Sequence, residues 1–120
     1  MLVIVKSAVY ISPMNSHHRI DMRSLELANA VISKVEPDPE RGIEIARNVC
    51  SRWLERGGSS AVTEWWTILS RSWDEIKAIL LDPTDYGQRL RQSNPFCGIL
   101  TPTERWDLYR RFAARETART

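Results

Sequence analysis

The sequence predicts a single all-α domain of five or six short helices. Apolar residues recur along the chain at steps of three and four, which is the spacing of one helix face. Three dipeptides each pair a capping side chain with a proline suited to the first helical turn, namely Asp38-Pro39, Asp82-Pro83 and Thr101-Pro102. The 120 residues are enough for one domain, and 42% hydrophobic with 27% charged residues is a globular balance.

The first two helices are predicted from apolar faces that end at turn residues. Residues 1–20 are expected to form a lead-in, and the first helix covers residues 21–36. It ends there because Pro37 disfavours helical geometry at the preceding position. The second helix covers residues 39–56, and Gly57-Gly58 then supplies the left-handed residue that helix ends favour.

The apolar start of the lead-in has two possible interpretations. Met1–Ile11 is apolar apart from Lys6 and Ser7, but it is shorter than the roughly 20 residues of a membrane span. It also lacks the basic region and the cleavage site of a signal peptide. The segment is expected to be either a short β-strand or a loose tail ahead of a native start at Met14.

Three short helices are predicted in the middle of the chain. Ser59-Ser60 caps a third helix that ends near Ser70. The pair of Ser72 and Glu75 is a capping box, which opens a fourth helix. Asp82-Pro83 is expected to open a fifth, to about residue 92, which Gly87 weakens by about 1 kcal/mol relative to alanine.

A loop and a final helix complete the predicted domain. Residues 93–100 contain Pro95, Gly98 and several apolar side chains, so we expect an ordered loop that docks under the last helix. A second capping box, Thr101 to Glu104, begins that helix. The predicted helical domain therefore covers residues 21–115, and residues 116–120 form a tail.

Charge is unevenly placed along the chain. Residues 1–85 carry 10 Lys+Arg against 12 Asp+Glu, whereas residues 86–120 carry 7 arginines against 3 acids. A basic third suits either an acidic partner surface or a phosphate backbone. Binding of nucleic acid would rest on its seven arginines, Arg89, Arg91, Arg105, Arg110, Arg111, Arg115 and Arg119.

Catalysis is not expected. Cys97 is the only candidate nucleophile. The two histidines that could act as its base, His17 and His18, lie in the lead-in. The sequence has no Gly-rich phosphate loop and no nucleophile elbow. We expect no metal and no cofactor, because zinc needs three or four ligands at defined spacing. Cys50 and Cys97 are expected to be reduced thiols of a cytoplasmic protein, with a disulfide between them as the alternative.

Five tryptophans are many for 120 residues, and most are expected in the core. Adjacent Trp65 and Trp66 point about 100° apart on a helix, so we expect one of them to be exposed. On the last helix, Arg105 falls inside an apolar arc that runs from Leu108 to Trp106. It either bonds carbonyls of the 93–100 loop or contacts a partner. The predicted partner-binding residues are Trp66, Arg105, Tyr109 and Arg111.

Two motifs resemble a group of small bacterial helical proteins. They are RSLEL at residues 23–27 and LRQSNPFCGILTPTERW at residues 90–106, and the resemblance covers most of residues 21–112. It implies no catalytic residue and no cofactor. Similar small helical proteins often look like one half of a toxin–antitoxin-type gene pair, so the resemblance implies binding to another protein. We therefore expect a non-catalytic interaction module of a bacterial cytoplasm. The alternative is a small DNA-binding regulator that uses the arginine-rich third.

Overall fold

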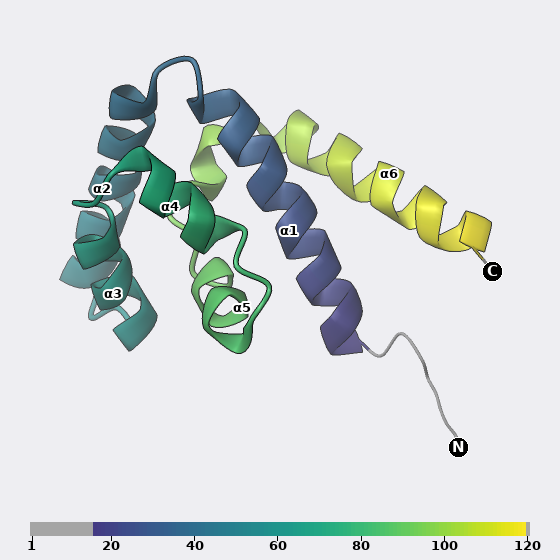
Figure 1. Cartoon of the computed structure of the whole chain (residues 1–120), viewed down its shortest axis with the longest axis horizontal. Helices are drawn as coiled ribbons and strands as arrows, with labels where there is room; N and C mark the ends of the chain where they lie inside the picture. Colours follow the sequence, from purple (N-terminus) through teal and green to yellow (C-terminus); the bar gives the residue numbers. More distant parts are fainter. Residues whose placement is uncertain (1–15, 120) are drawn as a thin grey trace.

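The computed structural model describes residues 16–119 (Figure 1). For residues 16–20 and for residue 119 it describes the backbone alone. The described part is all-α, as predicted, with six α-helices and one short 3₁₀ helix. Its elements are α1 (Ser16–Val35), α2 (Pro39–Glu55), α3 (Ser60–Ile68), α4 (Trp73–Leu80), α5 (Asp85–Arg91), η1 (Cys97–Ile99) and α6 (Pro102–Arg119).

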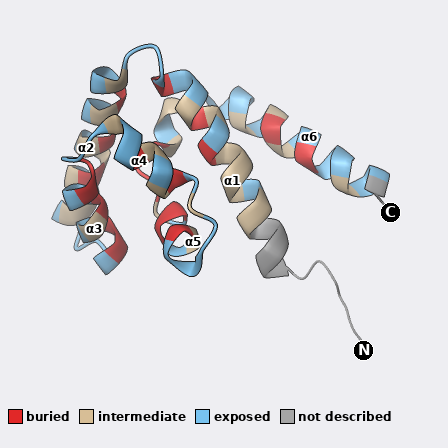
Figure 2. Ribbon diagram, in the orientation of Figure 1, coloured by how far each residue is buried: buried red, intermediate tan, exposed pale blue. Residues whose placement is uncertain are grey.

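Helix α1 is the organising element of the domain. It packs against α2, α4, α5 and η1 on one side and against α6 on the other. Figure 1 shows α2 and α3 side by side at one end of the molecule, and α6 as an arm beyond α1 at the other end. Because α6 packs chiefly against a single helix, much of its surface stays exposed (Figure 2).

The core is centred on the ring of Phe96, which lies between two tryptophans. Its centroid is 6.3 Å from that of Trp65, edge to face, and 6.2 Å from that of Trp73. Trp65 is fully buried, and its indole Nε1 donates a 2.8 Å hydrogen bond to the carbonyl of Leu90. The polar end of this large side chain is therefore satisfied inside the core.

Both predicted capping boxes are confirmed. The Ser72 hydroxyl accepts from the backbone N–H of Glu75, whose carboxylate accepts from the N–H of Ser72. Thr101 and Glu104 make the same reciprocal pair at the start of α6, at 3.1 and 2.7 Å. Gly57 has φ +80°, so the left-handed residue predicted after the second helix is also confirmed.

The predicted cap at Asp82 is wrong. Asp38 caps α2 by accepting from the N–H of Arg41, as expected. Asp82 instead accepts from the N–H and the hydroxyl of Thr84, at 2.8 and 2.6 Å. This local turn occupies the carboxylate, so α5 begins only at Asp85, two residues later than the motif indicates.

The first and last helices differ from their predicted bounds. Helix α1 begins at Ser16 rather than Asp21, whose carboxylate pairs with Arg91 instead of capping a helix. Helix α6 continues to Arg119, so most of the predicted tail is helical, with the Thr117 hydroxyl donating to the carbonyl of Ala113. The predictions for residues 1–15 lie outside the described residues.

Gly87 has a packing role that its helix propensity does not predict. A Cβ at this position would lie 2.0 Å from the carbonyl oxygen of Asp82. Glycine therefore allows the start of α5 to close onto the turn that precedes it, in addition to weakening the isolated helix.

The 93–100 loop is ordered, but it packs chiefly against α1 and α2 rather than under the last helix. The reason is that Phe96 enters the core, while the Asn94 side chain accepts from the N–H of Phe96 at 2.9 Å. Helix α6 reaches the loop through Arg105, which donates to the carbonyl of Cys97. Cys50 and Cys97 are both free thiols, as expected.

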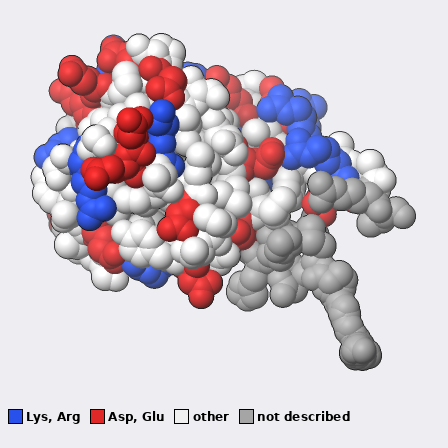
Figure 3. Space-filling view, viewed as in Figure 1, with Lys and Arg blue, Asp and Glu red and all other residues white. Residues whose placement is uncertain are grey.

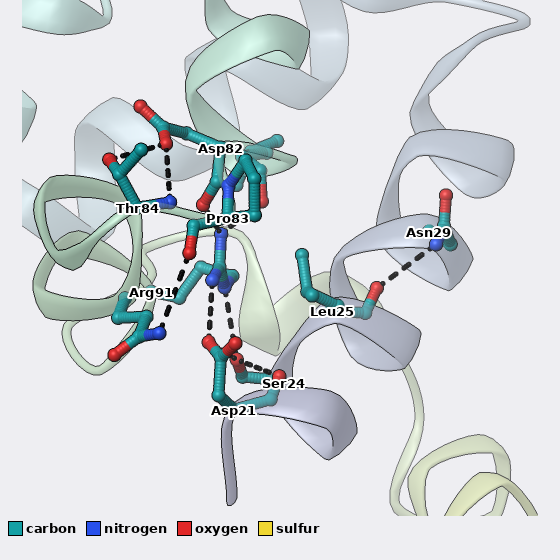
Figure 4. A network of polar contacts seen from close by, with 10 residues as sticks. Asp21, Ser24, Leu25, Asn29, Asp82, Pro83, Thr84 and Arg91 are labelled. Carbon is teal, nitrogen blue, oxygen red and sulfur yellow. Dashed lines mark hydrogen bonds and ion pairs between the residues drawn. The ribbon is translucent and has the colours of Figure 1, made fainter. Parts of the chain in front are cut away.

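One buried arginine joins α5, α1 and the turn after α4 (Figure 4). Arg91 is 5% exposed and forms a 2.6 Å ion pair with Asp21. Its guanidinium also donates to the Ser24 hydroxyl at 2.9 Å and to the carbonyls of Leu80 and Asp82 at 3.1 and 2.5 Å. These contacts satisfy a charge that would otherwise be costly to bury.

Candidate partner-binding surfaces

The four predicted partner-binding residues fall on two separate surfaces. Arg105 and Tyr109 belong to one side of α6, whereas Trp66 lies on α3 at the other end of the molecule (Figure 1). Arg111 lies on α6 but faces the α1 side, where it lines a hollow with Ala30. The sequence could not predict this division, because it depends on how α6 docks on α1.

The first surface is the outer half of the apolar arc of α6. Leu108 and Phe112 are buried, while the arc continues over Tyr109, Ala113 and Trp106 at helical spacing. We call these last three residues the α6 strip. Trp106 is 63% exposed, the most of any large hydrophobic residue described. Sequence reasoning placed Trp106 in the arc but did not select it as a contact residue.

Two arginines flank the α6 strip. The Arg23 guanidinium, from α1, lies 4.7 Å from the centroid of the Tyr109 ring and holds that ring by a cation–π contact. Arg105 is half-buried and donates to the Cys97 carbonyl at 3.1 Å. The predicted bond from Arg105 to the 93–100 loop is therefore confirmed, and its contact with a partner stays a prediction.

The second surface consists of three neighbouring hollows that share lining residues. A first hollow of about 370 Å³ lies between α1 and α6 and contains Lys34 and Arg111. A second, of about 320 Å³, lies at the α1–α2 turn and shares Lys34 with the first. A third, of about 940 Å³, follows α2 and the end of α3 and shares Asp38 and Arg41 with the second. We refer to these as the three hollows.

Trp66 lies in the third hollow, and its ring is covered by an arginine. Trp66 is 38% exposed while Trp65 is buried, so the expectation that one of the pair is exposed is confirmed. The Arg47 guanidinium lies 4.6 Å from the centroid of the Trp66 ring. This is a cation–π contact, in which the guanidinium lies over the face of the ring.

The arginine-rich third offers few free charges. Arg89 pairs with Glu64 and Arg115 with Glu26, each at 2.8 Å, and Arg110 pairs with Asp107. The prediction that Arg91 belongs to a surface patch is wrong, because its side chain is buried. Figure 3 shows Lys and Arg side chains gathered over α6. Arg111 is exposed there and takes part in none of the ion pairs of the described residues.

Both thiols have a raised pKa, although Cys50 is buried and Cys97 is only half-buried. Burial raises the pKa of Cys97, and the nearby charge of Arg105 opposes the shift only in part. Burial likewise raises the pKa of Cys50, whose Sγ donates to the Val62 carbonyl. A raised pKa keeps a thiol protonated, which is the opposite of what a nucleophile requires.

Metal-binding clusters and membrane-spanning helices are both absent from the described residues. Within residues 21–118, His, Cys, Asp and Glu side chains nowhere gather in a group of three that could hold a metal ion. Among the described helices, none combines the length and apolar character needed to cross a bilayer. Comparison with protein-family models, with curated protein sequences and with solved structures gives no match.

Proposed function

We propose that the chain is a non-catalytic protein-interaction module of a bacterial cytoplasm, antitoxin-like or an accessory partner of a neighbouring gene product. The single observation that carries the proposal is the exposure of Trp106 beside Tyr109 on a helix that packs against one neighbour. Trp and Tyr are enriched among interface hot spots, so two neighbouring aromatic side chains on an exposed helix face suit a protein interface.

The flanking contacts support this use of the α6 strip. Arg23 holds the Tyr109 ring by stacking, so little side-chain entropy is lost when a partner covers it. Ala113 follows Tyr109 by one helical turn on the same strip, and its small side chain leaves room beside the Tyr109 ring for a partner side chain. The antitoxin-like role rests on the resemblance of the two sequence motifs.

A capture experiment tests the proposal. The tagged full chain is incubated with lysate of its source organism, with and without nuclease, at low and at moderate salt. One protein recovered in stoichiometric amount, unaffected by nuclease and by moderate salt, is the expected result. Recovery of nuclease-sensitive material that is lost as salt rises would contradict it and favour the DNA-binding alternative, because phosphate contacts depend steeply on salt.

A matched pair of variants ties the capture to the α6 strip. Trp106→Ala removes the exposed indole, and Tyr86→Ala removes an aromatic side chain of α5 that is also exposed but lies outside the strip. The proposal expects capture to fail for Trp106→Ala alone. Equal capture by both variants would show that the partner binds elsewhere.

A further inference from the structure

We infer that α6 is a releasable arm, which separates from α1 while the rest of the domain stays folded, and that exposed ion pairs help to keep it docked. The inference concerns the chain alone and does not depend on the proposed function. Three observations carry it, namely where the core lies, how α6 is held on α1 and how α6 is connected to η1.

The hydrophobic core does not include α6. Within the described residues, the buried members of the core cluster lie between Ala28 and Leu100, and the partly buried side chains packed against them lie between Leu27 and Ile99. Leu108 and Phe112 of α6 are also buried, but neither belongs to this cluster. Separation of α6 therefore leaves the core intact, which is the condition for local opening of a single element.

The apolar contact between α6 and α1 is narrow. Among the described residues of α6, the buried hydrophobic side chains are Leu108 and Phe112. Beside Leu108, a hollow of about 370 Å³ lies between the two helices, and Ala30 and Ser33 of α1 are among the residues that line it. Part of the facing surfaces is thus without contact, whereas the interior of a domain is close-packed. Less apolar area is therefore removed from water here than in the core.

Two exposed ion pairs bridge α1 and α6. Lys34 binds Glu104 at 2.7 Å, with the two side chains 39% and 43% exposed. Arg115 binds Glu26 at 2.8 Å, with the two side chains 50% and 32% exposed. Exposed pairs of this kind each contribute little and are screened by salt. The docking of α6 should therefore weaken as salt rises, whereas the apolar packing of the core should not.

The connection to η1 allows α6 to move without disturbing the core. Only Leu100 and Thr101 lie between η1 and α6, and Leu100 is extended and buried in the core cluster. The reciprocal cap of Thr101 and Glu104 lies within the first turn of α6, so it persists on release. Arg105, which donates to the Cys97 carbonyl, ties only the beginning of the helix to η1. Rotation at Thr101 can therefore swing the far end of α6 away from α1.

Release changes the surface that α6 presents. Undocking exposes Leu108 and Phe112 beside the α6 strip, so the whole apolar arc becomes accessible along the helix. A partner that covers the α6 strip alone can bind the docked form. A partner that takes the whole arc must bind the released form and would shift the population toward it.

Native-state hydrogen exchange of the full chain, followed residue by residue by NMR, tests the inference. The reference is the amide of Leu69, which donates to the Trp65 carbonyl inside the core. After correction for intrinsic rates, the amides of Leu108 and Phe112 should exchange together and about tenfold or more faster than the reference. Raising NaCl to about 0.5 M should speed these α6 amides relative to the reference, because salt screens the exposed pairs.

A matched pair of variants tests the role of the ion pairs. Glu26→Gln removes the partner of Arg115, and Glu64→Gln removes the partner of Arg89 in a pair of the same 2.8 Å length between α3 and α5. Glu26→Gln should speed exchange of the α6 amides about two- to fivefold, whereas Glu64→Gln should change it less than about 1.5-fold. Exchange of the Leu69 amide in each variant reports whether the rest of the domain is intact.

Three outcomes would overturn the inference. Exchange of the α6 amides at the rate of Leu69 would show that α6 opens only when the whole domain unfolds. Protection that falls gradually from Leu108 toward the carboxyl terminus would indicate fraying of the helix end. Equal effects of the two variants, or no response to salt, would show that the ion pairs do not hold α6. None of these measurements uses a captured partner, so failure of the inference is distinguishable from failure of the proposed function.

Discussion

Arg91 and Asp21 are separated by 70 positions in the chain, yet their side chains meet at 2.6 Å beneath the surface. The guanidinium also donates to the Ser24 hydroxyl and to the carbonyls of Leu80, the last residue of α4, and Asp82. One side chain therefore joins the amino-terminal half of α1 to the α4–α5 turn. It is the most highly connected polar group in the described part of the molecule.

Removing this arginine should be the most damaging polar substitution. Arg91→Met leaves Asp21 unpaired and removes the donor of the Leu80 and Asp82 carbonyls, so we expect a loss of about 3–5 kcal/mol in the free energy of unfolding, measured in urea. Arg91→Lys should recover little of it, because an ammonium group cannot reproduce the planar fork. Arg52→Ala is the exposed control, and a loss below about 1 kcal/mol in Arg91→Met would contradict the structure.

Gly87→Ala is expected to destabilise the protein although alanine favours helices. The propensity gain is about 1 kcal/mol, but the added Cβ would lie 2.0 Å from the Asp82 carbonyl oxygen. Relieving this overlap requires movement of backbone, so we expect a net loss of about 1–3 kcal/mol in thermal or urea unfolding. Gly98→Ala, with open space around its Cβ, should change stability by less than about 0.5 kcal/mol. A stabilised Gly87→Ala would show that this contact is absent.

Arg105 and Trp106 are adjacent but should respond differently to truncation. Arg105→Ala breaks the bond to the Cys97 carbonyl and should lower the free energy of unfolding by about 1.5 kcal/mol. Trp106→Ala should lower it by less than about 0.5 kcal/mol, because the indole is mostly in water. A larger loss in Trp106→Ala than in Arg105→Ala would contradict the placement of the α6 strip on the surface.

Glu36 gives stability a defined dependence on pH. Hydrogen bonds from Trp73 and then Lys77 lower the pKa of its carboxyl below the ordinary value. A lowered folded pKa contributes stability that is present above the unfolded pKa, about 4.3 for glutamate, and is lost as pH falls through the folded value. Glu36→Gln should therefore lower the melting temperature at neutral pH and converge on the wild type in acid. Glu40→Gln, an exposed control outside any described ion pair, should run parallel to the wild type throughout.

The sequence predicts those features of the fold that depend on neighbouring residues. The reciprocal caps at Ser72 and Thr101 and the left-handed Gly57 need only a few adjacent positions, and all three are confirmed. The same reasoning fails at Asp82, because its carboxylate accepts hydrogen bonds from the N–H and hydroxyl of Thr84 instead of capping the helix. Local rules cannot rank two competing hydrogen bonds of similar strength.

The candidate sites depend on contacts between distant segments, which local patterns do not contain. The apolar arc of α6 is visible in the sequence, but which half of it α1 covers is decided by docking. The sequence therefore does not single out Trp106 as a contact residue. The burial of Arg91 likewise depends on contacts of α5 with α1 and with the end of α4. The three hollows are likewise invisible in the sequence, because they join residues of α1, α2, α3, η1 and α6.

The most direct test of the central claim measures how tightly the captured partner binds to the purified full chain and to two variants. If the α6 strip is the docking surface, Trp106→Ala loses about tenfold or more in affinity, while Tyr86→Ala stays within about twofold of the wild type. Unchanged melting temperatures would confirm that both variants are folded. Affinity retained by Trp106→Ala, or lost equally in both variants, would contradict the assignment of the α6 strip as the docking surface.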